Sequence, residues 1–422
     1  MAPYCPPVLR LFRNRDFVLL ISGQAVSQVG DGIFMVALAW RVFQSYNSPA
    51  ALSIVGIAFM LPRVVVTLAG GVLSDRFERR WTMIFADLGR AIPIALLAAI
   101  SLAPAQELVL IVILVAVQAV AGSLFHPAEA ALLPQLVEPD DLAAANSVRT
   151  IIGPLAWNVV GSALGGALTA VYGTSTAFWL NAGTFGVSIL TLLFMRPRPM
   201  TPTATRTSVL ADAREGFAYV AGRPWLWGPI LAASLGQLVC AGPTQALIPY
   251  LVKNELHASA AALGLVFAAG GVGTITAGLI MSRISRPPHI VTWMVLGWAA
   301  GFSALAVVGL AQTVWQAALA MFVWSVLLWS GEILWLTLLG LTVPNQIRGR
   351  VSSIDFVGSF WLIPASMALT GPASALLGPR TVLMAAGVVG GLAMLLTLLV
   401  PGVTRPQFLS AARTPAADLP LR

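Results

Sequence analysis

Charged residues are scarce in this chain. Only 9% of its 422 residues are Asp, Glu, Lys or Arg, against about 25% in an ordinary soluble domain. Hydrophobic residues make up 58%, and the mean hydropathy is +0.86. This composition excludes a water-soluble protein of this size. The formal net charge of +8 does not indicate a nucleic-acid partner, because the charges are scattered between apolar runs instead of gathered in one stripe.

Cysteine and histidine are also sparse. Cys5 and Cys240 lie far apart, and Cys240 falls within an apolar run, so no disulfide is expected. The histidines at 126, 257 and 289 form no group with metal-ligand spacing. The sequence contains neither a Walker-type phosphate loop nor a convincing nucleophile–base set. We therefore expect no enzyme activity, no metal and no cofactor.

Long apolar runs dominate what is present. A helix that crosses a bilayer needs about 20 mostly apolar residues. Runs of that length lie near residues 17–41, 51–73, 81–103, 107–128, 143–171, 175–195, 225–252, 261–282, 289–311, 315–341, 351–376 and 381–400. The first is too long for a signal-peptide core and no small-residue cleavage site follows it, so we expect it to be retained. The sequence predicts an all-α membrane protein with twelve transmembrane helices.

Basic residues predict the orientation of these helices. With both ends in the cytoplasm, 18 of the 24 Lys and Arg fall on cytoplasmic segments, and only Arg41, Lys253 and Arg380 fall outside. The longest polar break, 196–224, separates a six-helix half at 17–195 from another at 225–400. Residues 1–16 then form a cytoplasmic N-terminus and 401–422 a disordered cytoplasmic tail. We expect a monomer in the bacterial inner membrane.

The polar break contains apolar residues at helical spacing, which predicts an amphipathic helix on the inner membrane surface. These residues are Val209, Leu210, Ala213, Phe217 and Val220. The two halves also repeat weakly: the pattern that begins at Gly71 recurs 207 residues later at Gly278. Such a repeat is typical of two parallel halves about a central cavity.

Residues 70–80 read Gly-Gly-Val-Leu-Ser-Asp-Arg-Phe-Glu-Arg-Arg. Five charges in six residues cannot lie in hydrocarbon, so the segment turns back at a membrane face. Its order resembles the loop signature between helices 2 and 3 of major facilitator superfamily transporters, Gly-x-Leu-x-Asp-Arg-x-Gly-Arg-Arg. The matching residues are Gly71, Leu73, Asp75, Arg76, Arg79 and Arg80. Glu78 stands where that family prefers glycine.

Further stretches narrow the resemblance to the bacterial branch that exports drugs and siderophores, which includes enterobactin, tetracycline and macrolide exporters. They are the segments 61–63, 126–134, 142–147, 214–224 and 344–351. The resemblance covers about residues 8–400 and implies export driven by the proton gradient. Antiporters of the superfamily usually carry Gly-Pro-x-x-Gly-Gly on helix 5. Here Gly153-Pro154 is present, but the paired glycines appear only at Gly165-Gly166.

Ionisable side chains at helix centres cost about 2.5–3.5 kcal/mol on insertion scales, so each needs a reason. Asp31 and Arg63 lie at depths that agree to within about one helical turn. We expect them to face each other or to share a water-filled cavity. Asp31 is then either the proton-titrating group, with Arg63 beside it, or half of a static ion pair between two helices.

Glu332 is a second candidate for proton coupling. It lies near mid-depth of the tenth helix among Trp324, Trp329 and Trp335. An acid beside aromatic rings suits a lipophilic cation. The alternative is a protonated, hydrogen-bonded glutamate between helices.

Two further sets of residues are assigned from sequence. An inner latch of ion pairs, closing the cavity in one state, would use the signature loop and charges near the cytoplasmic ends: Gly71, Asp75, Arg76, Arg79, Arg80, Asp87, Arg90, Arg149 and Asp355. Polar and aromatic residues inside spans are candidates for substrate binding: Gln28, Gln118, Asn158, Gln237, Trp324 and Trp335. Glu129 is expected to be solvated at a helix end.

These patterns predict a secondary active transporter that exports amphiphilic small molecules or drugs in exchange for protons, by alternating access in the bilayer. The alternative substrate is a siderophore or metabolite. An anionic siderophore favours a cavity dominated by Arg63, Arg90 and Arg149, and a cationic drug favours one dominated by Asp31 and Glu332. A non-transporting membrane receptor or assembly factor is the alternative of another class.

Overall fold

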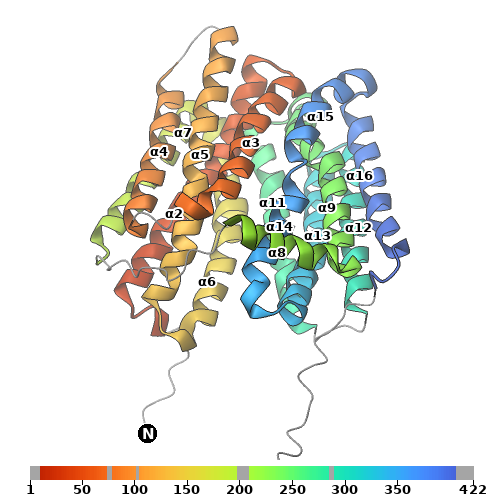
Figure 1. The fold of residues 1–422 in the computed structure, drawn as a ribbon. Helices are drawn as coiled ribbons and strands as arrows, with labels where there is room; N and C mark the ends of the chain where they lie inside the picture. The colour runs from red at the N-terminus through yellow and green to blue at the C-terminus, as the bar shows by residue number, and fades with distance from the viewer. Residues whose placement is uncertain (1–9, 74–77, 101–103, 197–208, 285–288, 405–422) are drawn as a thin grey trace, which may run out of the picture.

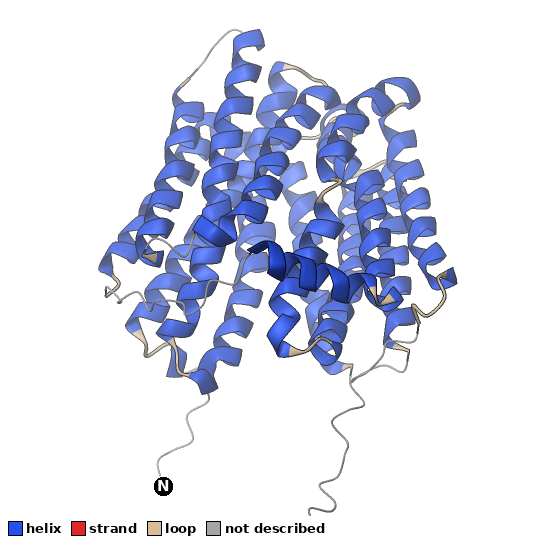
Figure 2. Ribbon diagram, viewed as in Figure 1, coloured by secondary structure: helices blue, strands red, loops and turns tan. Residues whose placement is uncertain are grey.

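The structure is a computed structural model that describes residues 10–73, 78–100, 104–196, 209–284 and 289–404. These residues are almost entirely helical, and no strand occurs among them (Figure 2). Most helices run side by side, and the start of the first lies at the same end of the bundle as the end of the last (Figure 1). The all-α prediction is confirmed.

The first half of the chain forms the group of helices coloured red to yellow in Figure 1. Its elements are α2 (Arg15–Ser45), α3 (Pro49–Leu73), α4 (Arg79–Ala99), α5 (Pro104–Leu136), the short η1 (Pro139–Asp141), α6 (Leu142–Pro154), the π-helical η2 (Leu155–Gly161) and α7 (Ser162–Phe194). Asn14 caps α2, since its side-chain oxygen accepts hydrogen bonds from the backbone N–H groups of Asp16 and Phe17.

The second half forms the green and blue group. Its elements are α9 (Pro224–Gly242), π-helical η3 (Pro243–Leu247), α10 (Ile248–Tyr250), π-helical η4 (Leu251–Glu255), α11 (Ala260–Arg283), α12 (Ile290–Leu310), α13 (Val314–Thr342), α14 (Asn345–Phe360), α15 (Ile363–Leu377), α16 (Pro379–Leu396) and η5 (Thr397–Leu399). A capping box between Thr313 and Gln316 begins α13.

Eleven helical stretches among the described residues are long and apolar enough to cross a membrane. One of them, Ala144–Phe194, has 51 residues, more than twice the about 20 that one crossing needs. It is divided at Gly173, whose φ of +81° lies in the region that glycine adopts without strain. Counting both parts gives twelve crossing segments in the described chain, as the sequence predicts.

Corresponding helices pair in the same way in the two halves. In the first half α2 contacts α7, α3 contacts α5, and α4 contacts both α5 and α7. In the second half α9 contacts α16, α11 contacts α13, and α12 contacts both α13 and α16. The weak sequence repeat therefore corresponds to a repeated helix arrangement.

The two halves meet closely at the end of the bundle away from the start of α2. There α7 approaches α11 through Gly166 and Gly264, and a Cβ on Gly166 would lie 2.8 Å from the Cα of Gly264. The Nζ of Lys253 donates a hydrogen bond to the carbonyl of Phe43 in the last turn of α2. A second hydrogen bond, of 3.3 Å, joins Lys253 to the side chain of Asn47.

The polar break carries the predicted amphipathic helix, α8 (Val209–Ala221). It crosses in front of the other helices (Figure 1) and packs on α14, where a Cβ on Gly216 would lie 2.7 Å from Cδ1 of Ile354. Glu215 and Arg350 form a salt bridge between the same two helices. Phe217 is exposed, whereas Val220 is buried. This segment is therefore attached to the second half.

Candidate functional site

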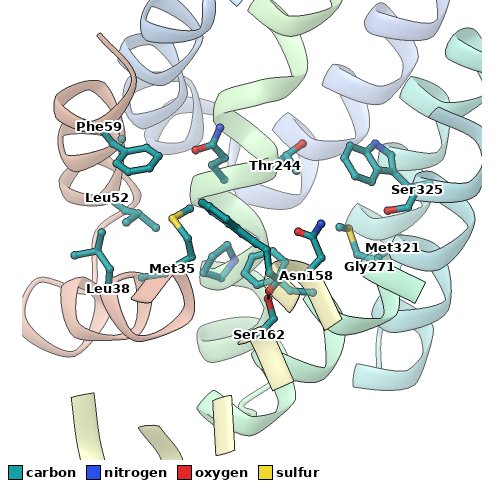
Figure 3. Close-up of a pocket in the computed structure, with 18 of the residues that line it drawn as sticks. Met35, Leu38, Leu52, Phe59, Asn158, Ser162, Thr244, Gly271, Met321 and Ser325 are labelled. Atoms are coloured by element: carbon teal, nitrogen blue, oxygen red, sulfur yellow. Dashed lines mark hydrogen bonds between the residues drawn. The ribbon is translucent and has the colours of Figure 1, made fainter. Parts of the chain in front are cut away.

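A cavity of about 290 Å³ lies between the two halves. Helices α2 and α3 and the π-helical η2 line it on one side, and η3, α11, α13 and α15 on the other. Figure 3 shows Met35 and Phe59 on the first side, and Thr244, Met321 and Ser325 on the second. The walls are mainly apolar, with a few amide and hydroxyl groups, which is typical of small-molecule sites. We call this space the central cavity.

A cluster of charged side chains lies beside the central cavity within the first half. Nη1 of Arg90 on α4 is 3.4 Å from Oδ2 of Asp31 on α2, and Arg90 also pairs with Asp87 one turn away. All three side chains are almost fully buried. The two acids pair with Arg90 because an unpaired buried charge carries a large free-energy cost. Phe125 and Phe185 face the guanidinium of Arg90, with ring centroids 4.6 and 4.4 Å from its carbon.

A small second cavity opens within this cluster. Asp31, Arg63, Arg90, Gln118 and His126 all line it. The prediction that Asp31 and Arg63 share a cavity is confirmed, although Asp31 forms its salt bridge with Arg90. We call Asp31, Arg63, Asp87 and Arg90 the charged cluster. It contains two acids and two arginines, so its formal charge is balanced.

The predicted latch is not one group. The expectation that Asp87 and Arg90 lie near the cytoplasmic ends is wrong, because they lie at mid-helix with Asp31. Arg149 on α6 instead pairs with Glu129 on α5, with 2.6 Å between Nε and Oε1. The expectation that Glu129 is solvated is also wrong. Its side chain is only 2% exposed, since α5 continues past it to Leu136.

The signature loop itself is described only in part. Gly71 lies in the last turn of α3, and Asp75 and Arg76 lie outside the described residues. Arg79 begins α4, and Nη2 of Arg80 donates a 2.9 Å hydrogen bond to a carbonyl in the last turns of α7. The latch role of this loop stays a prediction.

A third cavity, of about 210 Å³, lies within the second half. Glu332 on α13 and Asp355 on α14 both line it, together with Trp298, Trp329 and Trp335. Asp355, expected in the latch, therefore lies with Glu332. Nε1 of Trp335 donates a 3.0 Å hydrogen bond to Oδ2 of Asp355. Within the described part of the chain, no salt bridge to Glu332 is formed. We call this space the acidic cavity.

The predicted substrate-binding residues divide among these spaces. Asn158 and Trp324 line the central cavity. Gln237 and Trp335 line the acidic cavity. Gln118 lies in the charged cluster's small cavity. They therefore do not form a single site.

Gln28 is placed differently, at the contact between α2 and α6. A Cβ on Gly153 would lie 3.2 Å from its Oε1. The same face of α2 meets Gly161 and Gly165, so these two glycines allow close packing against α2. A Cβ on Gly165 would lie 2.7 Å from the Cα of Ile33.

Sequence reasoning missed the roles of Phe59 and Trp157. Both line the central cavity and the small cavity of the charged cluster. Trp157 lies in η2, a π-helical turn of the kind often found at functional sites. The available signal was the pair of helix-weakening residues, Pro154 and Gly161, on either side of it.

Comparison with known proteins gives a consistent result. Residues 20–362 match the Major Facilitator Superfamily. The uncharacterized MFS-type transporter YfiS of Bacillus subtilis is 29% identical, covering 81% of this chain and 82% of that protein. The multidrug efflux pump Tap of Mycolicibacterium fortuitum is 28% identical over 85% and 89%. The enterobactin exporter EntS of Citrobacter koseri is 28% identical over 76% and 73%.

Solved structures share the fold. The nucleoside transporter NupG aligns with a TM-score of 0.67 at 13% identity, covering 92% of this chain and 99% of that one. A bacterial homologue of the iron transporter ferroportin in an inward-facing state aligns with a TM-score of 0.71 at 16% identity, covering 92% and 99%.

Proposed function

The chain belongs to the major facilitator superfamily, and from that premise we propose that it is a proton-coupled exporter of cationic amphiphilic molecules. The observation that carries this proposal is the placement of an apolar cavity between a balanced charged cluster in one half and an acidic cavity in the other. Relatives named as a multidrug efflux pump and an enterobactin exporter support export.

The central cavity suits amphiphilic cargo of varied shape. Methionines contribute to both of its sides, through Met35 in the first half and Met321 and Met367 in the second. Methionine is unbranched and polarizable, so it adapts to different apolar shapes. Asn158 and Thr244 are among the few polar groups that can orient a cargo.

The charges favour a cationic cargo over an anionic siderophore. Arg90 is engaged by two acids, and Arg149 is engaged by Glu129. Glu332 and Asp355 instead share a cavity with three tryptophan rings and no arginine or lysine among the described residues that line it. Carboxylates with aromatic faces attract organic cations by charge and by cation–π contact.

Asp31 is the proposed proton carrier. Its carboxylate is buried and lies with Arg90 and Arg63 in the small cavity, which shares lining residues with the central cavity. When Asp31 takes up a proton, the formal charge of the cluster changes from zero to +1. A neighbouring cation is then repelled, which links proton entry to cargo release. With termini in the cytoplasm, the end closed by Lys253 and Gly264 faces outside.

The test uses purified protein in proteoliposomes, an imposed pH gradient and tetraphenylphosphonium as the cationic probe. One-for-one exchange supports up to about tenfold accumulation per pH unit, since one unit corresponds to about 1.4 kcal/mol. Asp31→Asn should abolish accumulation while leaving exchange of labelled for unlabelled probe at equal pH. The control is Asp140→Asn, which removes an exposed acid.

Unchanged accumulation in Asp31→Asn would refute the proton role. Accumulation of an anionic catecholate but not of tetraphenylphosphonium would favour a siderophore exporter instead. If the wild type moves neither probe, a non-transporting role is favoured.

A further inference from the structure

Two cavities of different chemistry share a wall. The central cavity is mainly apolar, whereas the small cavity contains Asp31, Arg63 and Arg90. Phe59 and Trp157 line both spaces. A molecule in the central cavity can therefore contact the same two residues that line the cavity of the charged cluster.

The ring of Phe59 contacts a charged side chain. The guanidinium carbon of Arg63 lies 4.7 Å from the centroid of the Phe59 ring, which is within the range of a cation–π contact. The side chain is 6% exposed. Movement of this ring by cargo therefore changes the surroundings of Arg63 directly.

Trp157 is carried by backbone that packs directly against the helix of Asp31. A Cβ on Gly161 would lie 2.6 Å from the carbonyl oxygen of Val29 and 2.9 Å from the Cα of Gly32. Gly32 follows Asp31 directly in α2, so the π-helical turn and the helix of the acid are in backbone contact. Trp157 lines both cavities beside this contact, so an occupant that displaces its side chain acts next to the helix that carries Asp31.

We propose that Phe59 and Trp157 form a partition that makes proton access to Asp31 conditional on cargo. The partition keeps the charged cluster from the central cavity when the cavity is empty, and cargo displaces the rings. This inference rests on the proposed function for its coupling role. The separation of the two cavities by these rings can be tested without it.

The separation is tested by chemical access. A reactive thiol is placed in the small cavity by Gln118→Cys, after Cys5→Ser and Cys240→Ala, and its reaction rate with methanethiosulfonate-ethylammonium is measured. Phe59→Leu combined with Trp157→Leu should raise that rate at least tenfold. The matched control is Trp329→Leu, since Trp329 lines the central and acidic cavities but not the charged cluster. Equal rates in both backgrounds would overturn the partition.

Coupling is tested in proteoliposomes that contain a trapped pH-sensitive dye. The double variant should leak protons at least tenfold faster than wild type without cargo. It should also lower the ratio of tetraphenylphosphonium accumulated in a pH gradient to tetraphenylphosphonium exchanged at equal pH, a ratio that corrects for any change in cargo binding. Trp329→Leu should change probe affinity without a leak. A double variant that leaks protons no faster than wild type and accumulates tetraphenylphosphonium equally well would overturn the inference. Failure of the wild type to couple protons at all would instead refute the proposed function, and the thiol rates would still decide the partition.

Discussion

The contact between Gly264 on α11 and α7 allows a strong test of how the two halves close. We consider Gly264→Ala, the addition of a single methyl group. The new Cβ would lie 2.5 Å from the carbonyl oxygen of Ser162 and 2.8 Å from the Cα of Gly166. Both neighbours are backbone atoms, so no side-chain rotation can relieve the overlap.

The expected magnitude follows from this overlap. Ordinary contact of a methyl carbon begins near 3.4 Å, so α7 and α11 must separate by about 1 Å. Inserting a methyl group into well-packed surroundings costs about 1–3 kcal/mol. Because this contact joins the two halves, the cost falls on the state in which this end is closed. The ratio of open to closed molecules should rise about 5- to 150-fold.

Distances between spin labels measure that ratio. Tyr172→Cys on α7 and Leu376→Cys on α15 place nitroxides on exposed positions, one in each half, in the background without native cysteines. Gly264→Ala should increase the long-distance population. Gly183→Ala on α7 is the matched control, since a Cβ there has no atom within 4 Å. Identical distance distributions in Gly264→Ala and wild type would refute the reasoning.

Charged contacts lead to three more predictions. Lys253→Met removes the hydrogen bond to the Phe43 carbonyl. The loss of about 1–2 kcal/mol of stabilisation of the closed state should raise the open population about 5- to 30-fold. Lys253→Arg should restore closure in the same spin-label measurement. Glu129→Gln removes the charged partner of Arg149 and should lower the free energy of unfolding by up to about 3 kcal/mol, because Arg149 is partly solvated; the loss is measured as a lower melting temperature in detergent. A double variant that also carries Arg149→Gln should recover most of the loss. Equal melting temperatures of the single and double variants would contradict the pairing. Glu332→Gln should weaken binding of tetraphenylphosphonium at least tenfold and leave an uncharged analogue unaffected; equal losses for both probes, measured by equilibrium binding, would show that the acid acts only on structure.

Much of the fold could be predicted from the sequence, because the bilayer limits how apolar segments can be arranged. Run length gives the crossings, and helical spacing gives the amphipathic α8. Depth along a helix also places Asp31 and Arg63 in one cavity. Depth does not give direction around the helix axis, so the choice between Arg63 and Arg90 as ion-pair partner required the structure.

The error at Glu129 comes from the estimated end of its helix. The length of the apolar run places Pro127 near the end of its helix, yet α5 contains both Pro127 and Pro134 and continues to Leu136. Glu129 therefore lies two turns inside the helix and is buried. Pro154 and Gly161 indicate a weak point in this helix, but the π-helical turn that carries Trp157 also involves the backbone contact of Gly161 with α2, which only the structure shows.

The glycine contact between α7 and α11 also determines how far the attraction between the halves extends. It is made by backbone atoms of Gly166, Gly264 and their neighbours, so it depends on dispersion. A gap of up to about 1 Å already removes a quarter to a half of such attraction, whereas ion pairs act over about 8 Å at physiological ionic strength. Partly opened arrangements therefore keep only part of the attraction from this contact, and it is lost over a short distance of opening. The glycine contact should therefore release over a short distance, and changing the salt concentration should scarcely alter its own contribution to closure.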